Sequence, residues 1–150
     1  MKKLLILVSL GGLLIGTASA QITQVKLAPL TPGEGLFFGQ TVAIAESIAV
    51  VSVGLIGANA AFSFRWDGTD RREIGRLIPS DGEAEGFGVV STTDEFAIVG
   101  APLFDHPAAT NGGAQYTFER TGDNWAQQMR IAPSDVDGQG RFGQLGGDCR

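Results

Sequence analysis

Short apolar segments, each bounded by glycine or proline, recur along the chain after Ala20. Residues 96–99 read Phe-Ala-Ile-Val and are followed by Gly-Ala-Pro at 100–102. Proline lacks the backbone donor that a sheet needs, so it ends the strand there. Apolar segments of the same kind occur at 48–51 and, in alternating form, at 41–44. We expect each of these segments to be a β-strand.

A strict alternation of apolar and polar residues marks a further strand. Residues 115–120 place Tyr116 and Phe118 on one face and polar side chains on the other. A turn at 122–124, which contains glycine, leads into another strand at 125–131. No window after Ala20 carries the apolar stripe of a helix. The sequence therefore predicts an all-β fold.

These strands belong to a repeated unit. A basic residue, an aliphatic residue, any residue and a proline occur in that order at 26–29, 76–79 and 130–133. Phe-Gly follows each of these segments, at 38–39, 87–88 and 142–143, so the unit recurs at intervals of about fifty residues. Residues 62–65 also match 116–119, at an offset of 54. Several strands in a unit of this length fit one four-stranded blade of a β-propeller.

The clearest copy of the unit covers residues 87–135. Its Phe-Gly and Gly-Ala-Pro are followed by Gly-Ala-Gln-Tyr-Thr-Phe at 113–118, Gly-x-x-Trp at 122–125 and Arg-Ile-x-Pro-Ser-Asp at 130–135. This order of motifs resembles the FG-GAP repeat, which builds the propeller of integrin α-subunits and of many exported bacterial proteins. The first copy departs from the pattern, because Ser-Val-Gly stands in place of Gly-Ala-Pro and Arg71 in place of the tryptophan.

The resemblance implies an FG-GAP repeat region at 21–150 that forms an incomplete β-propeller. Its two four-stranded blades would cover about 24–75 and 76–129, with the start of a third blade at 130–150. Propellers have four to eight blades, which need about 200 residues or more. We therefore expect a truncated piece of a longer propeller, or a ring that a partner chain or further copies complete.

Residues 1–20 have the order of a secretory signal peptide. A basic start is followed by an apolar run to Ile15 and by Ala-Ser-Ala at 18–20. The alternative is a membrane anchor, but the run is shorter than the roughly 20 apolar residues that a spanning helix needs. We expect cleavage after Ala20, no membrane anchor, and a secreted, periplasmic or cell-surface protein.

The charge and the cysteine content narrow the choice of partners. The formal net charge is −5 and no run of basic residues occurs, which argues against binding of nucleic acid. Cys149 is the single cysteine, so no internal disulfide can form. It either pairs between chains or has no role.

Residues suited to catalysis are few and scattered. His106 is the single histidine and follows Asp105. A nucleophile could work with this histidine, and the available residues are Ser91, Ser134 and Cys149. The spacing singles out none of them. Glu83 and Glu85 could act as an acid and a base, but they lie in a glycine-rich segment typical of a solvated turn. We expect no catalytic site.

Calcium loops of the Asp-x-Asp-x-Asp-Gly kind occur in many FG-GAP proteins, between the first two strands of a blade. The corresponding loops here, at 45–47 and 92–95, hold too few oxygen ligands. Asp-Val-Asp-Gly at 135–138 aligns with the segment that joins two blades. We therefore expect no metal site and no cofactor.

Three functions follow from these observations. The favoured one is an exported, non-catalytic binding or adhesion module, in which the polar loop at 103–113 contacts a protein or a glycan. The second is a fragment of a longer propeller with no function of its own. The third is an exported hydrolase, because some propellers carry active sites at the channel mouth.

Overall fold

The computed structural model describes residues 26–29, 37–53, 60–82, 86–107, 110–135 and 140–144. These residues form eight β-strands and no helix, and no membrane-spanning helix occurs among them. The strands are β1 (Val42–Ile44), β2 (Ile48–Ser52), β3 (Ala61–Trp66), β4 (Arg71–Leu77), β5 (Val89–Thr92), β6 (Phe96–Ala101), β7 (Ala114–Thr121) and β8 (Asn124–Ile131). The predicted all-β class is confirmed. The predicted signal peptide at 1–20 lies outside the described residues.

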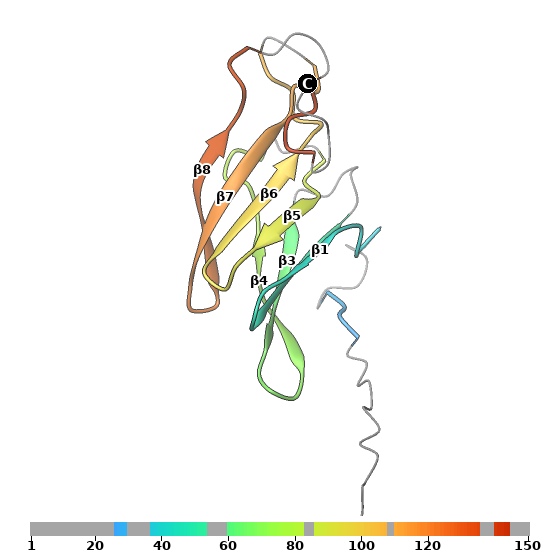
Figure 1. The fold of residues 1–150 in the computed structure, drawn as a ribbon, viewed down its shortest axis with the longest axis vertical. Helices are drawn as coiled ribbons and strands as arrows, with labels where there is room; N and C mark the ends of the chain where they lie inside the picture. Colours follow the sequence, from blue (N-terminus) through green and yellow to red (C-terminus); the bar gives the residue numbers. More distant parts are fainter. Residues whose placement is uncertain are drawn as a thin grey trace, which may run out of the picture.

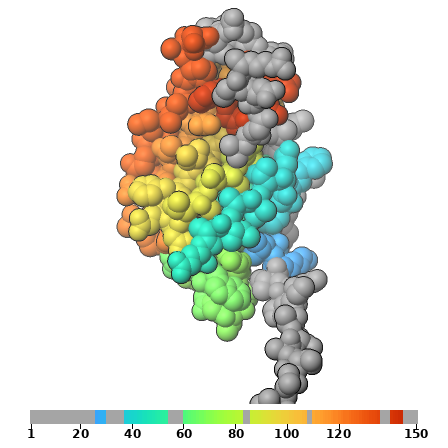
Figure 2. All heavy atoms as spheres, viewed as in Figure 1, coloured from blue at the N-terminus to red at the C-terminus, as the bar shows by residue number. Residues whose placement is uncertain are grey.

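The strands form two four-stranded antiparallel sheets, each connected in sequence order (Figure 1). We call β1–β4 the first sheet and β5–β8 the second sheet. In the described part of the chain neither sheet closes on itself. The two sheets stack in matching order, because β5 contacts β1 and β2 while β8 contacts β4. In Figure 2 the cyan segment that contains β1 lies beside the yellow segment of β5 and β6.

The two sheets are paired in the same register. Val42 pairs with Val51 in the first sheet, and Val90 pairs with Val99 in the second, at an offset of 48 along the sequence. In the last two strands of each sheet the offset is 54 instead, and both β3 and β7 carry a bulge at the same position. The additional length lies in the connection from β6 to β7. The repeat predicted from the sequence is thus a repeat of structure.

The three Phe-Gly segments also share one feature of the backbone. The residue before each phenylalanine has a positive φ: 65° at Phe37, 76° at Gly86 and 46° at Arg141. Positive φ is uncommon for residues other than glycine. The glycine that follows the phenylalanine has a φ of 92° at Gly39 and Gly143, whereas Gly88 does not have a positive φ. The first and third segments are therefore the most alike.

An aromatic cluster of the same geometry lies in each sheet. Phe87 meets Tyr116 and Phe118 edge to face, with ring centroids 5.6 and 6.0 Å apart. Its counterpart in the first sheet is Phe38, which meets Phe62 and Phe64 at 5.7 and 6.1 Å. Edge-to-face pairs of this kind stabilise a core beyond the burial of area.

The main core lies between the sheets. Ile48 and Val50 of β2 are fully buried against the second sheet, in one cluster with Phe87 and the aromatic residues of β7. Polar contacts cross the same interface. Trp125 of β8 donates its indole N–H to Oγ of Ser63 in β3, at 2.8 Å.

Candidate protein-binding surface

The side of the second sheet that faces away from the first carries exposed apolar residues. We call this side the outer face. Alternation along β6 places Phe96 and Ile98 there, with 51% and 44% of their surface exposed. On β8, Met129 and Ile131 lie opposite Thr117 and Gln115 of β7, with 57% and 39% of their surface exposed. The polar residues Thr117 and Gln115 of β7 lie between these two pairs, and the exposed Glu119 lies opposite Phe96. A surface with several exposed apolar residues is typical of a binding site.

The corresponding positions of the first sheet are covered. Phe96 and Ile98 stand where the first sheet has Ile48 and Val50, which are 0% exposed. Ile131 likewise stands where the first sheet has Leu77, which is also 0% exposed. The outer face therefore has the apolar character of an interface between sheets, but it is exposed.

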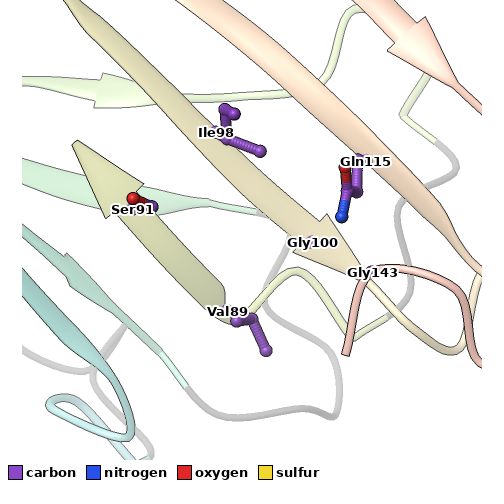
Figure 3. Close-up of a pocket in the computed structure, with 6 residues that line it drawn as sticks. All are labelled: Val89, Ser91, Ile98, Gly100, Gln115 and Gly143. Carbon is purple, nitrogen blue, oxygen red and sulfur yellow. The ribbon is translucent and has the colours of Figure 1, made fainter. Parts of the chain in front are cut away.

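A hollow of about 200 Å³ lies on the outer face (Figure 3). Figure 3 shows residues of β5, β6 and β7 around it, together with the third Phe-Gly segment. The residues that line it are Val89, Ser91, Ile98, Gly100, Gln115 and Gly143. None of them carries a charge, and Ser91 and Gln115 are the polar side chains in the lining. The hollow is therefore suited to an apolar strand with few polar partners.

In the first sheet, β5 occupies the corresponding position. Thr41 and Val50 of the first sheet align with Val89 and Ile98 of the hollow. Thr41 donates its hydroxyl to the carbonyl oxygen of Gly88, the residue just before β5. The hollow is thus equivalent to the place where β5 lies in the contact between the two sheets.

The third Phe-Gly segment is held at the end of the hollow. Phe142 forms a parallel bridge with Gly113, and its backbone N–H donates to the carbonyl oxygen of Gly112 at 3.0 Å. A Cβ on Gly100 would overlap the carbonyl oxygen of Gly143, so glycine at position 100 allows this close approach. The outer face therefore already carries the turn that precedes the first strand of a unit.

The loop at 103–113, which we expected to be a recognition loop, is anchored to the second sheet. Its Phe104 is 3% exposed and lies under the Arg130 guanidinium, whose carbon is 5.0 Å from the ring centroid. Asp105 accepts a hydrogen bond from the backbone N–H of Asn111 at 2.8 Å. Residues 108–109 lie outside the described part. The described part of the loop supports Phe142 and leaves only a few side chains exposed.

The candidate catalytic residues come from separate parts of the second sheet. Ser91 lies in β5 on the outer face, His106 lies in the connection from β6 to β7, and Ser134 follows β8. The remaining candidates, Glu83, Glu85 and Cys149, lie outside the described residues. The three described candidates thus come from different segments of the second unit.

Asp94, an acidic residue of the loops considered for calcium, bonds to a residue of the first sheet. Asp94 accepts hydrogen bonds from the backbone N–H and the hydroxyl of Ser47, at 3.0 and 2.9 Å. The backbone N–H of Ser47 is the main cause that lowers the pKa of Asp94. Asp94 thus links the two sheets. Within the described ranges, no group of three or more His, Cys, Asp or Glu residues could hold a metal ion. Residues 136–138 lie outside those ranges.

Comparison with protein-family models, with curated proteins and with solved structures finds no match. What the chain does is therefore inferred from its own residues and their arrangement.

The outer face was missed at the sequence level, although a signal for it exists. Residues 96–99 are apolar on both faces of the strand, which is typical of a strand covered on both sides. Among the described residues, the first sheet covers one side of β6 and leaves the other side exposed. A search for strands without alternation would have singled out this segment.

Proposed function

We propose that this chain is an exported, non-catalytic protein-binding module of the FG-GAP repeat class. The outer face of the second sheet is its binding surface. One observation carries the proposal: Phe96 and Ile98 are about half exposed, while their counterparts Ile48 and Val50 are fully buried by a neighbouring sheet. A partner that covers this face would gain about 25 cal/mol for each Å² of apolar surface removed from water.

A protein partner fits the face better than a glycan. Sugars offer many hydroxyl groups, and burying them without hydrogen bonds is costly. Ser91 and Gln115 are the polar side chains that the hollow presents. The other lining residues are aliphatic or glycine, and a strand or a sheet face packs well on such a surface.

The arrangement of the sheets supports the propeller architecture as part of this proposal. Two units of equal register stack in matching strand order, as consecutive blades do. A second candidate function, a fragment of a longer propeller without a role of its own, is favoured by the placement of Phe142 and Gly143 at the hollow. The coding sequence after the codon for Arg150 tests it: further Phe-Gly and Gly-Ala-Pro units there would support the fragment.

The proposed binding surface is tested by capture of partners from the medium of the exporting cell. The tagged protein and an Ile98→Glu variant are compared, with Ile78→Glu as a matched control. Ile78 is 55% exposed and lies after β4, outside the outer face. We expect Ile98→Glu to reduce capture of a protein partner at least tenfold, because it places a charge in an apolar interface. Equal capture by Ile98→Glu and the control would contradict the proposal.

Export is tested separately by the N-terminal sequence of the protein recovered outside the cytoplasm. We expect the chain to begin at Gln21, because small residues at 18–20 suit signal peptidase. Recovery of the uncleaved chain from the cytoplasm alone would contradict export.

A further inference from the structure

A second exposed apolar strip lies on the first sheet. Val42 and Ile44 of the edge strand β1 are 55% and 64% exposed. The counterpart of Val42 in the second sheet is Val90 of β5, which is 5% exposed because it packs in the core between the sheets. The strip on β1 therefore matches β5 at Val42, while Ile44 stands where β5 has Thr92.

The contact between the two sheets thus has two halves, and the molecule exposes a second copy of each. In one half, β1 and β2 present Ile48 and Val50; its exposed counterpart is the outer face, with Phe96 and Ile98. The other half is the side of β5 that lies on β1 and β2. The equivalent strand of the first sheet is β1, and its equivalent side, which carries Val42 and Ile44, is exposed. One chain therefore carries both surfaces of a contact that it already makes internally.

We propose that a second copy of this chain docks head to tail, with β1 of one copy lying in the hollow on β5 and β6 of the next. The contact repeats the one that β5 makes with β1 and β2 inside the chain, except at the preceding Phe-Gly turn, whose place is already held by Gly143 of the receiving copy. This inference rests on the proposed function, since it names the partner of the outer face. The surfaces that meet are different, so the contact is heterologous and continues from copy to copy until the rotation closes a ring.

The contact is confined to the strip along β1. Leu27 and Phe38 already pack against the remaining apolar residues on that side of the first sheet, and Phe62 and Phe64 are only 1% exposed. Val42 and Ile44 remain available for the hollow. Their side chains are aliphatic, like those of Val89 and Ile98 that receive them.

One charged pair opposes this docking and makes its orientation testable. Inside the chain the turn between β1 and β2 meets the turn between β5 and β6, where Ser47 donates to Asp94. Glu46 is the counterpart of Asp94, and Glu95 is the counterpart of Ser47, by the offset of 48. Head-to-tail docking therefore brings Glu46 of one copy toward Glu95 of the next, and the two like charges repel.

Sedimentation velocity over a range of concentrations tests the inference on the exported full-length protein. We expect species larger than the monomer that grow with concentration. Ile44→Glu and Ile98→Glu should each weaken association at least tenfold, while Ile78→Glu should leave it unchanged. Circular dichroism and the unfolding midpoint of each variant show that it is folded.

A mixture of the two defective variants separates head-to-tail docking from a symmetric contact. The Ile44→Glu chain keeps an intact outer face, and the Ile98→Glu chain keeps an intact β1. We expect the mixture to form a 1:1 dimer and nothing larger, because each chain retains one surface. A symmetric pairing of two outer faces would instead be lost in Ile98→Glu and untouched in Ile44→Glu. The mixture would then contain Ile44→Glu homodimers and no heterodimer, and this pattern would overturn the proposal.

Glu95→Lys provides a test that does not depend on losing a contact. We expect it to tighten association at least threefold, because lysine would then face Glu46 of the next copy. Weaker association of Glu95→Lys would overturn the orientation.

A protein that stays monomeric at every concentration would overturn docking of a second copy. The capture of a different protein, lost in Ile98→Glu, would then still support the proposed binding function.

Discussion

The two sheets have the same strand order, register and aromatic cluster, yet they differ in what covers them. The face of the first sheet that carries Ile48 and Val50 is buried under the second sheet. The same face of the second sheet leaves Phe96 and Ile98 about half exposed. Equivalent strands therefore differ in energetic role because of their neighbours, and the exposed copy is the one available to a partner.

A second difference lies where each sheet turns into its last strand. Trp125 of the second sheet reaches across to Ser63, where its indole N–H donates a hydrogen bond. The first sheet has Arg71 at the equivalent position, lying 5.6 Å from the centroid of the Trp66 ring. The second sheet is thus shaped to pack on a preceding sheet through this tryptophan, and the first sheet is not.

The largest expected effect comes from removing the aromatic centre of each sheet. Phe87→Ala should lower the free energy of unfolding by about 3–5 kcal/mol, because Phe87 is fully buried in the core between the sheets. Phe38→Ala should cost less, about 1–2 kcal/mol, since Phe38 is only partly buried. Urea unfolding of both variants measures the difference. Equal losses would show that the two clusters contribute alike.

High pH should act through a tyrosine of the second sheet that has no counterpart in the first. Tyr116 is the single tyrosine, and burial, together with the charge of Asp81, raises its pKa from 10.0 to about 12. The folded state holds the phenolic proton more tightly than the unfolded state does. Its contribution to stability is therefore complete below pH 10 and is lost between about pH 10 and pH 12. The counterpart in the first sheet is Phe62, which does not titrate.

Titration of the tyrosinate absorbance checks this expectation, and Asp81→Asn sharpens it. The hydroxyl of Tyr116 donates to Asp81 at 3.1 Å, and Arg130 donates to the same carboxylate oxygen at 2.8 Å. Removing the charge of Asp81 should lower the pKa of Tyr116 toward 10 without reaching it, because burial remains the main cause of the shift. A tyrosine that titrates near pH 10 in the folded protein would contradict its burial.

The smallest effect concerns the ion pairs that cross between the sheets. Asp123 of the turn between β7 and β8 lies 2.6 Å from Arg65 and 3.2 Å from Arg72 of the first sheet. These side chains are partly exposed, so Asp123→Asn should lower the free energy of unfolding by about 0–1 kcal/mol. The loss should shrink in high salt. A loss above about 2 kcal/mol, independent of salt, would show a buried contact instead.

Much of the architecture could be predicted from residue patterns. The match between 62–65 and 116–119 predicted that the third strands of the two units are equivalent, and the pairing confirms it. The bulges of β3 and β7 at the same offset follow from the same match. At 103–113 the residue pattern gave no sign that Phe104 is buried. A single apolar residue in a loop carries no periodic signal, so its burial is decided by the sheet beneath it.

The sequence by itself determined that strands repeat, which residues share a face, and where the Phe-Gly turns fall. These properties are local, because alternation and φ preferences act over a few residues. Only the tertiary structure decided that both faces of β2 are covered, whereas one face of β6 is exposed. Burial depends on which sheet lies next to a strand, and two strands with similar residues, such as 48–51 and 96–99, carry no record of that neighbour.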